Sequence, residues 1–113
     1  MIDAPKELEF LENDFYPFNL ELNDDGMVSY KKSYSSGREL NIILELSGMQ
    51  SNVTVEIQEG QSTLVSILVN KADSIAFQTW GKEQVIRVYS SDTNHDFLVY
   101  HAPEPRILFG EVA

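Results

Sequence analysis

The feature that most constrains the fold is an alternation of apolar and polar side chains that runs from residue 18 almost to the end of the chain. In residues 53–58, for example, Val53, Val55 and Ile57 alternate with threonine, glutamate and glutamine. Successive side chains of a β-strand point to opposite faces of the sheet, so this period is typical of strands with one buried face. The pattern therefore predicts a chain built largely from β-sheet.

Turn-forming residues interrupt this alternation roughly every 8 to 12 residues. The breaks give eight or nine predicted strands, within residues 18–22, 27–34, 40–46, 53–58, 64–69, 75–79, 85–89, 97–101 and 107–109. Short strands at such regular spacing are typical of an antiparallel sandwich or barrel. We therefore expect a mainly β fold with a single domain over residues 1–113: a β-sandwich or a barrel of about eight strands with a short N-terminal helix.

One segment of the chain fits two secondary structures. Leu64, Leu68, Ala72 and Ile75 recur at helical spacing, and Ser62 stands where it would cap a helix. The same segment contains β-branched residues, which favour strands. We predict a strand here and keep a helix as the alternative.

The N-terminal residues predict a short helix over residues 6–12, which Asp3 would cap. Tyr16 and Pro17 would then stop it, because proline cannot continue a helix. The acids of this helix are expected to form a solvated ridge opposite its apolar face. That apolar face is predicted to consist of Leu8, Leu11 and Phe15.

The chain has 18 acidic and 8 basic residues, a formal net charge of −10. Most of the excess lies in residues 1–25, where eight acids stand against Lys6 alone and give a local charge of −7. Nucleic-acid phosphates and anionic lipids repel such a chain. The composition therefore disfavours a nucleic-acid partner and a membrane partner.

Residues 7–25 combine seven acids with four aromatic rings and contain no base. One interpretation is a solvated surface that keeps a small domain soluble. The other is an interface with a basic protein, because rings and charges together are typical of tight protein contacts. The residues predicted to bind such a partner are Glu7, Glu9, Glu12, Asp14, Tyr16, Glu21, Asp24 and Asp25.

In its size, its β-rich pattern, its lack of cysteine and its acidic run from Glu7 to Asp25, the chain resembles the small acidic immunity proteins and antitoxins of bacteria. The resemblance implies a cytosolic, non-enzymatic inhibitor that blocks a basic partner such as a nuclease toxin. A phage-encoded inhibitor that mimics the charge of nucleic acid would share these features. Those families are mutually dissimilar, so no residue role is carried over from them.

No catalytic motif occurs in the sequence. The absence of cysteine excludes a disulfide scaffold, a thiolate zinc site and a cysteine nucleophile. His95 and His101 would lie about 20 Å apart along a strand, too far for one metal ion. A Gly-x-Ser-x-Gly elbow and a phosphate-binding loop are both missing. We therefore predict no enzymatic activity, no metal and no cofactor.

Aromatic residues outside the acidic run suggest an alternative function. Trp80, Tyr89 and Tyr100 would form a stacking platform on a sheet face, because flat rings offer broad contact area to a ligand. The alternative is therefore a carbohydrate-binding or small-ligand-binding β-domain that uses these three rings.

The remaining composition is that of an ordinary globular protein, with 42% apolar and 23% charged residues in 113. The first residues contain no basic region followed by an apolar run, and no segment approaches the roughly 20 apolar residues that span a bilayer. We therefore expect a cytoplasmic protein that folds without a metal or disulfide staple.

Overall fold

The computed structural model describes residues 5–18, 27–45, 52–90 and 95–111. Within these residues the chain forms one short helix and nine strands. The helix α1 spans Glu7–Glu12, and the strands are β1 (Tyr16–Pro17), β2 (Met27–Ser33), β3 (Arg38–Glu45), β4 (Asn52–Glu59), β5 (Ser62–Val69), β6 (Ala72–Trp80), β7 (Glu83–Ser90), β8 (His95–Ala102) and β9 (Arg106–Glu111).

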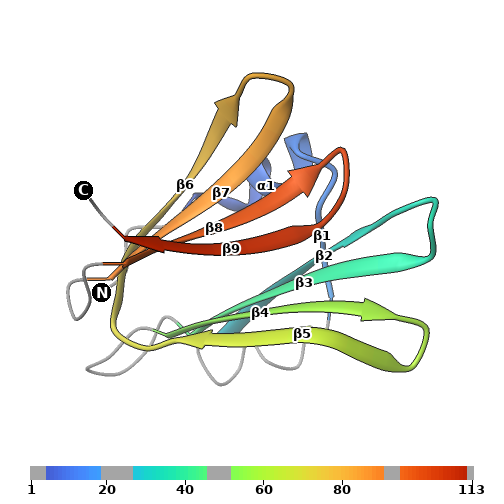
Figure 1. Cartoon of the computed structure of the whole chain (residues 1–113), viewed down its shortest axis with the longest axis horizontal. Helices are drawn as coiled ribbons and strands as arrows, with labels where there is room; N and C mark the ends of the chain where they lie inside the picture. The colour runs from blue at the N-terminus through green and yellow to red at the C-terminus, as the bar shows by residue number, and fades with distance from the viewer. Residues whose placement is uncertain (1–4, 19–26, 46–51, 91–94, 112–113) are drawn as a thin grey trace.

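The strands form two antiparallel sheets, one with the order β1-β2-β3-β4-β5 and one with the order β6-β7-β8-β9. In each sheet the spatial order follows the chain order, so neighbouring strands are joined by short local connections. Figure 1 shows the two sheets as separate layers, with the second sheet above the first. This arrangement confirms the predicted mainly β fold and is a sandwich, since the described strands do not close into a barrel.

The core lies between the sheets and is made by the alternating positions that the sequence indicates. The register pairs Leu40 with Ile57 and Leu44 with Val53, all of them buried. Side chains such as Val99 of the second sheet complete the same cluster. Strands of both sheets therefore direct apolar side chains into a single core.

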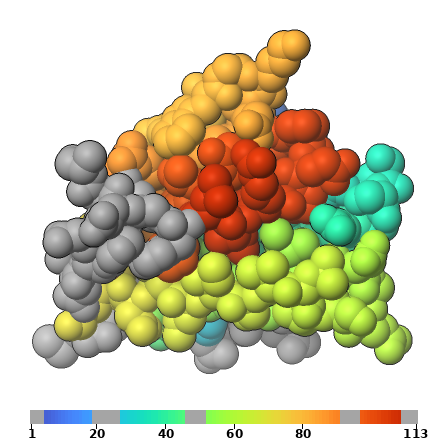
Figure 2. Space-filling model, in the orientation of Figure 1, coloured from blue at the N-terminus to red at the C-terminus, as the bar shows by residue number. Residues whose placement is uncertain are grey.

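The segment 62–69 is a strand, as the β-branched residues predicted. It forms the last strand of the five-stranded sheet and pairs with β4. In the space-filling view the side chains of β4 and β5 form a continuous band along the lower part of the molecule (Figure 2). This strand therefore lies at the surface.

A cluster of aromatic rings attaches the N-terminal segment to both sheets. The ring of Phe10 stacks on Tyr30 of β2 with centroids 3.9 Å apart, and it meets Phe77 of β6 edge-on at 5.0 Å. Phe15 packs edge-on against Phe10 at 5.8 Å. Phe10 and Phe15 are 0% and 1% exposed. The helix is thus held by a ring that contacts one strand from each sheet.

The predicted apolar face of the helix was wrong in two of its three members. Leu8 is 65% exposed and Leu11 is 44% exposed, whereas Phe10 is the buried residue of α1. Phe15 is buried as predicted, but it lies after the helix, where Asp14 adopts a positive φ of 68° and turns the chain. A helix of six residues has too few turns to bury a full stripe.

The boundaries at the N-terminus also differ from the prediction. Lys6, not Asp3, is the N-cap residue, and its side chain makes no capping hydrogen bond. Asp3 lies outside the described residues. Tyr16 and Pro17 do more than stop the helix, because they form β1 and pair with β2. Most of the predicted strand over 18–22 lies outside the described residues.

Replacement of Phe10 tests the role of the ring cluster. Phe10→Ala should lower the free energy of unfolding by about 3–5 kcal/mol, because it leaves a cavity between the two sheets. Leu8→Ala in the same helix is the matched control and should change it by less than about 0.5 kcal/mol, since Leu8 is largely exposed. Urea denaturation measures both values, and equal effects would contradict this account.

Candidate functional site

Helix α1 and the residues that follow it present acids to solvent. Glu7, Glu9, Glu12 and Asp14 are all exposed. None of the four forms an ion pair with a side chain in the described part of the chain. Among the described residues these carboxylates thus form a patch of negative charge that can attract a basic partner, with Asp14 also acting on the buried ammonium of Lys32.

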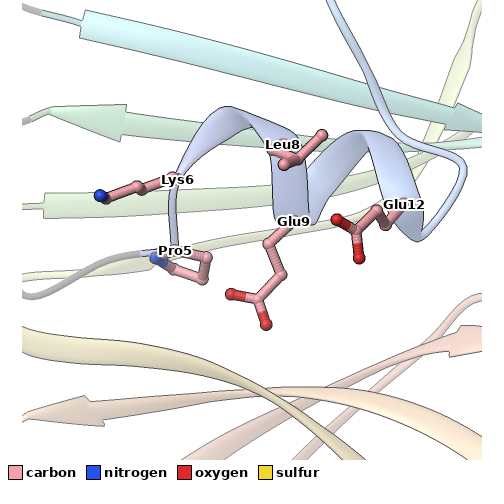
Figure 3. A pocket seen from close by; sticks show the side chains of 5 residues that line it. All are labelled: Pro5, Lys6, Leu8, Glu9 and Glu12. Carbon is pink, nitrogen blue, oxygen red and sulfur yellow. The ribbon is translucent and has the colours of Figure 1, made fainter.

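The same surface carries exposed apolar side chains. Leu8 and Leu11 lie one helical turn apart, and Leu8 lies one turn from Glu12. An open hollow is lined by Pro5, Lys6, Leu8, Glu9 and Glu12, and Figure 3 shows the carboxylates of Glu9 and Glu12 extending to the same side of the helix. We call the acids and leucines of α1, together with Asp14 and Tyr16, the α1 surface.

The predicted partner-binding residues fall into two groups. Five of them lie in this stretch and are exposed: Glu7, Glu9, Glu12, Asp14 and Tyr16. The other three, Glu21, Asp24 and Asp25, lie outside the described residues. Two of the four rings that we expected beside the acids, Phe10 and Phe15, are core residues instead, and Tyr16 is the exposed one at 43%.

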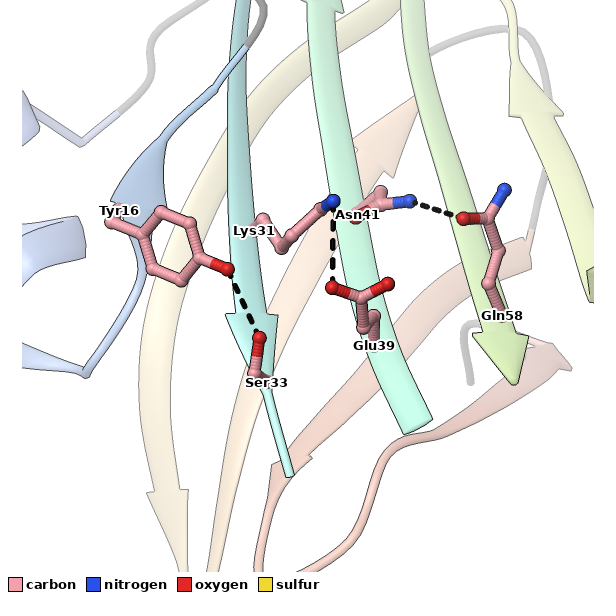
Figure 4. A network of polar contacts seen from close by, with 6 residues as sticks. All are labelled: Tyr16, Lys31, Ser33, Glu39, Asn41 and Gln58. Atoms are coloured by element: carbon pink, nitrogen blue, oxygen red, sulfur yellow. Dashed lines mark hydrogen bonds and ion pairs between the residues drawn. The ribbon is translucent and has the colours of Figure 1, made fainter. Parts of the chain in front are cut away.

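A polar network on the outer face of the first sheet borders Tyr16 (Figure 4). The Tyr16 hydroxyl lies 3.0 Å from the Ser33 hydroxyl. On the next strands the ammonium of Lys31 lies 3.4 Å from the carboxylate of Glu39, and Asn41 donates to Gln58 at 3.2 Å. Lys31 is thus paired with Glu39 and does not neutralise the acids of the α1 surface.

A second polar group, which the sequence did not indicate, lies inside the sandwich. The Lys32 ammonium lies 3.2 Å from Nδ1 of His101, although these residues are 9% and 1% exposed. Tyr34 donates its hydroxyl hydrogen to the His101 carbonyl oxygen at 2.7 Å. The rings of Phe15 and Phe77 stand against the imidazole at 5.3 and 5.5 Å. The pair is enclosed by aromatic side chains.

Burial determines the charge state of this pair. Burial and the nearby Lys32 ammonium lower the pKa of His101 to about 4 from its ordinary 6.5. Burial also lowers the pKa of Lys32, against a smaller raising effect of Asp14. Near neutral pH His101 is therefore neutral and accepts from Lys32 through Nδ1, which places its proton on Nε2. That nitrogen has no hydrogen-bond partner among the described residues.

Sequence reasoning treated His101 as an ordinary residue at a strand end, whereas it is a core residue. Its place in the alternation after Phe97 and Val99 would have indicated an inward side chain. The enclosed position leaves little surface for a substrate to reach. No group of three or more potential metal ligands converges in the part of the chain that the structure describes.

The three rings of the alternative site lie on the outer face of the second sheet, because each alternates with an inward neighbour. Trp80 is 41% exposed and donates from Nε1 to Gln78 at 3.0 Å, while Gln78 donates to the Tyr89 hydroxyl at 3.4 Å. We call Trp80, Gln78 and Tyr89 the aromatic platform.

Tyr100 was wrongly predicted to be an exposed ligand-binding ring. It is only 7% exposed, since the guanidinium of Arg106 lies 4.0 Å from the centre of its ring. Glu83 holds Arg106 in place through an ion pair of 3.0 Å. This cover removes Tyr100 from the alternative site. The guanidinium of Arg87 likewise lies 4.8 Å from the centre of the Tyr89 ring, so Trp80 is the most exposed ring of the three.

The Lys32–His101 pair predicts a loss of stability in acid. The unfolded chain takes up a proton on His101 below about pH 6.5, whereas the folded chain resists protonation down to about pH 4. Stability should therefore fall as the pH drops through this window, by about 3 kcal/mol. The lowered pKa of Lys32 has the same sign, but its effect on stability begins at higher pH, below the ordinary lysine pKa of 10.5.

Urea denaturation at pH 7 and pH 4 measures this loss. His101→Gln keeps a hydrogen-bond acceptor for Lys32 but does not titrate, so the variant should lose most of the pH dependence in this window. An equally steep fall in the variant would show that other groups cause it.

Comparisons with known proteins find no relative of this chain. No family model, no curated protein and no solved structure matches the chain. The described helix is also too short and too polar to cross a membrane.

Proposed function

We propose that the chain is a non-enzymatic, protein-binding inhibitor whose α1 surface binds and blocks a basic protein. One observation carries the proposal: Leu8 and Leu11 face solvent among carboxylates that have no ion-pair partner in the described residues. Apolar contact area beside complementary charge is what a protein interface combines.

The two kinds of side chain would contribute in different ways. Complementary charges accelerate association with a basic partner, to about 10⁸ M⁻¹s⁻¹ or more at low salt. Full burial of a leucine side chain contributes about 1.5–3 kcal/mol. The carboxylates would thus control the association rate, while Leu8 and Leu11 would control the dissociation rate.

The class of partner follows from the chemistry of the surface. Closely spaced carboxylates complement a site built from lysine and arginine to hold phosphates, such as the active site of a nuclease. The resemblance to immunity proteins and antitoxins supports the same class. We therefore propose an immunity protein or antitoxin that blocks a basic toxin, most simply a nuclease.

Charge reversal on α1 tests this proposal. Glu9→Lys combined with Glu12→Lys should slow association with the partner at least about tenfold, because it replaces attraction by repulsion. The partner is first captured from a lysate of the native host on the immobilised protein, and its association rate is then measured by surface plasmon resonance.

The matched control is Glu59→Lys combined with Glu104→Lys, two exposed acids outside α1. This double variant changes the net charge by the same amount as the α1 double variant, and it should keep most of the wild-type association rate. Equal rates for the two double variants would contradict binding through α1. Leu8→Ala combined with Leu11→Ala should instead raise the dissociation rate.

A second candidate function is carbohydrate binding at the aromatic platform. The observation that favours it is Gln78, which bonds to both Trp80 and Tyr89 and fixes the two rings on one sheet face. The Trp80 ring, held in this way, can stack on the face of a sugar with little loss of side-chain entropy.

Tryptophan fluorescence tests this candidate directly, because Trp80 is the chain's one tryptophan. A sugar that binds at the platform should shift its emission in titrations against a panel of neutral glycans. Tyr89→Ala keeps the reporter and should weaken that response several-fold. An unchanged spectrum across the panel would remove this candidate function.

A further inference from the structure

The hydrogen bonds of the aromatic platform run in one direction. The indole Nε1 of Trp80 carries a hydrogen and no lone pair for bonding, so it can only donate. Its partner at 3.0 Å is therefore the amide oxygen Oε1 of Gln78, which fixes the orientation of that amide. The amide nitrogen Nε2 then lies 3.4 Å from the Tyr89 hydroxyl and donates to it. One donor-only group thus sets the direction of both bonds.

This direction determines what Tyr89 offers to a ligand. Its hydroxyl oxygen accepts from Gln78, which leaves its hydrogen to donate. Among the described residues no acceptor takes that hydrogen. Tyr89 is only partly buried and lies on the outer face of the second sheet. The platform therefore presents an unused hydrogen-bond donor near an exposed indole ring.

The surroundings of this donor favour a neutral ligand with an acceptor. The neighbouring Arg87, whose guanidinium lies 4.8 Å from the centre of the Tyr89 ring, also carries only donors. A sugar hydroxyl would bring its own hydrogen to this place, whereas the carbonyl oxygen of an acetamido group only accepts. Carboxylate and sulfate groups of sugars accept as well, but the net charge of −10 repels them. A neutral N-acetylated sugar meets both conditions.

The indole supplies the apolar part of the contact. Trp80 is 41% exposed, and Gln78 holds its ring in place. Since a single amide joins the indole to the Tyr89 hydroxyl, both groups lie within reach of one sugar unit. The sugar ring would stack on the indole face while its acetamido carbonyl reaches the hydroxyl.

We propose that the aromatic platform binds a neutral N-acetylated sugar whose acetamido carbonyl accepts the hydroxyl hydrogen of Tyr89 and whose ring stacks on Trp80. Gln78 holds both groups and is the positioning residue. The assignment rests on the carbohydrate-binding candidate, whose ligand class it names.

Two sugars that differ at one group test the proposal. They are the methyl β-glycosides of N-acetylglucosamine and of glucose, with an acetamido group or a hydroxyl at the same carbon. The Trp80 indole gives the chain's one indole N–H signal in ¹⁵N NMR, so its shift reports binding at the platform. The wild-type protein should bind the acetamido sugar about three- to tenfold more tightly, the range that one neutral hydrogen bond contributes.

Tyr89→Phe keeps the ring and removes only the donor. This variant should bind the two sugars with equal affinity, because the acetamido carbonyl has lost its partner. Tyr16→Phe is the matched control, since it removes the hydroxyl of an exposed tyrosine on the first sheet and should keep the wild-type preference. The strand signals in the same spectra check that both variants stay folded.

Three results would overturn the inference, and only the last would also remove the carbohydrate-binding candidate. The first is equal affinity of the wild-type protein for the two sugars. The second is a preference for the acetamido sugar that persists in Tyr89→Phe. The third is an indole signal that neither sugar shifts.

Discussion

The stacking of Phe10 on Tyr30 is the interaction on which the arrangement of the N-terminal segment depends. A helix of six residues has no stability of its own in water, so it needs a tertiary anchor. Phe10 is that anchor, because its ring also meets Phe77 of the other sheet. The remaining side chains of α1 then have no core to enter. The exposure of its acids and leucines thus follows from one buried ring.

The interior near this anchor contains a buried polar pair whose hydrogen bonding is incomplete among the described residues. Phe15 contacts the imidazole of His101, which shares a buried site with Lys32 and leaves one nitrogen without a partner among the described residues. Burial of an ammonium beside a neutral imidazole costs desolvation energy, and the hydrogen bonds of the pair offset only part of that cost. The domain therefore keeps an acid-sensitive polar pair beside the rings that position α1.

The strands could be predicted from the sequence, because successive side chains of a β-strand point to opposite faces of the sheet and so produce a two-residue alternation. The choice between a sandwich and a barrel could not, since the same alternation serves both. The helix face was misjudged because Leu8 and Leu11 share the spacing of a buried stripe, and only the packing of Phe10 decides which side turns inward. Tyr100 was misplaced because its cover, Arg106, comes from a neighbouring strand.

Helix α1 is fixed to the sandwich and presents its surface in one orientation. Amide hydrogen exchange by NMR measures this directly at Phe10 and Phe15, whose N–H groups donate to the carbonyls of Lys6 and Phe10. The Phe10 and Phe15 amides should be protected from exchange nearly as well as the amides of the central strands. Exchange at the rate of an unfolded chain would show instead that the core does not hold the acidic segment in place.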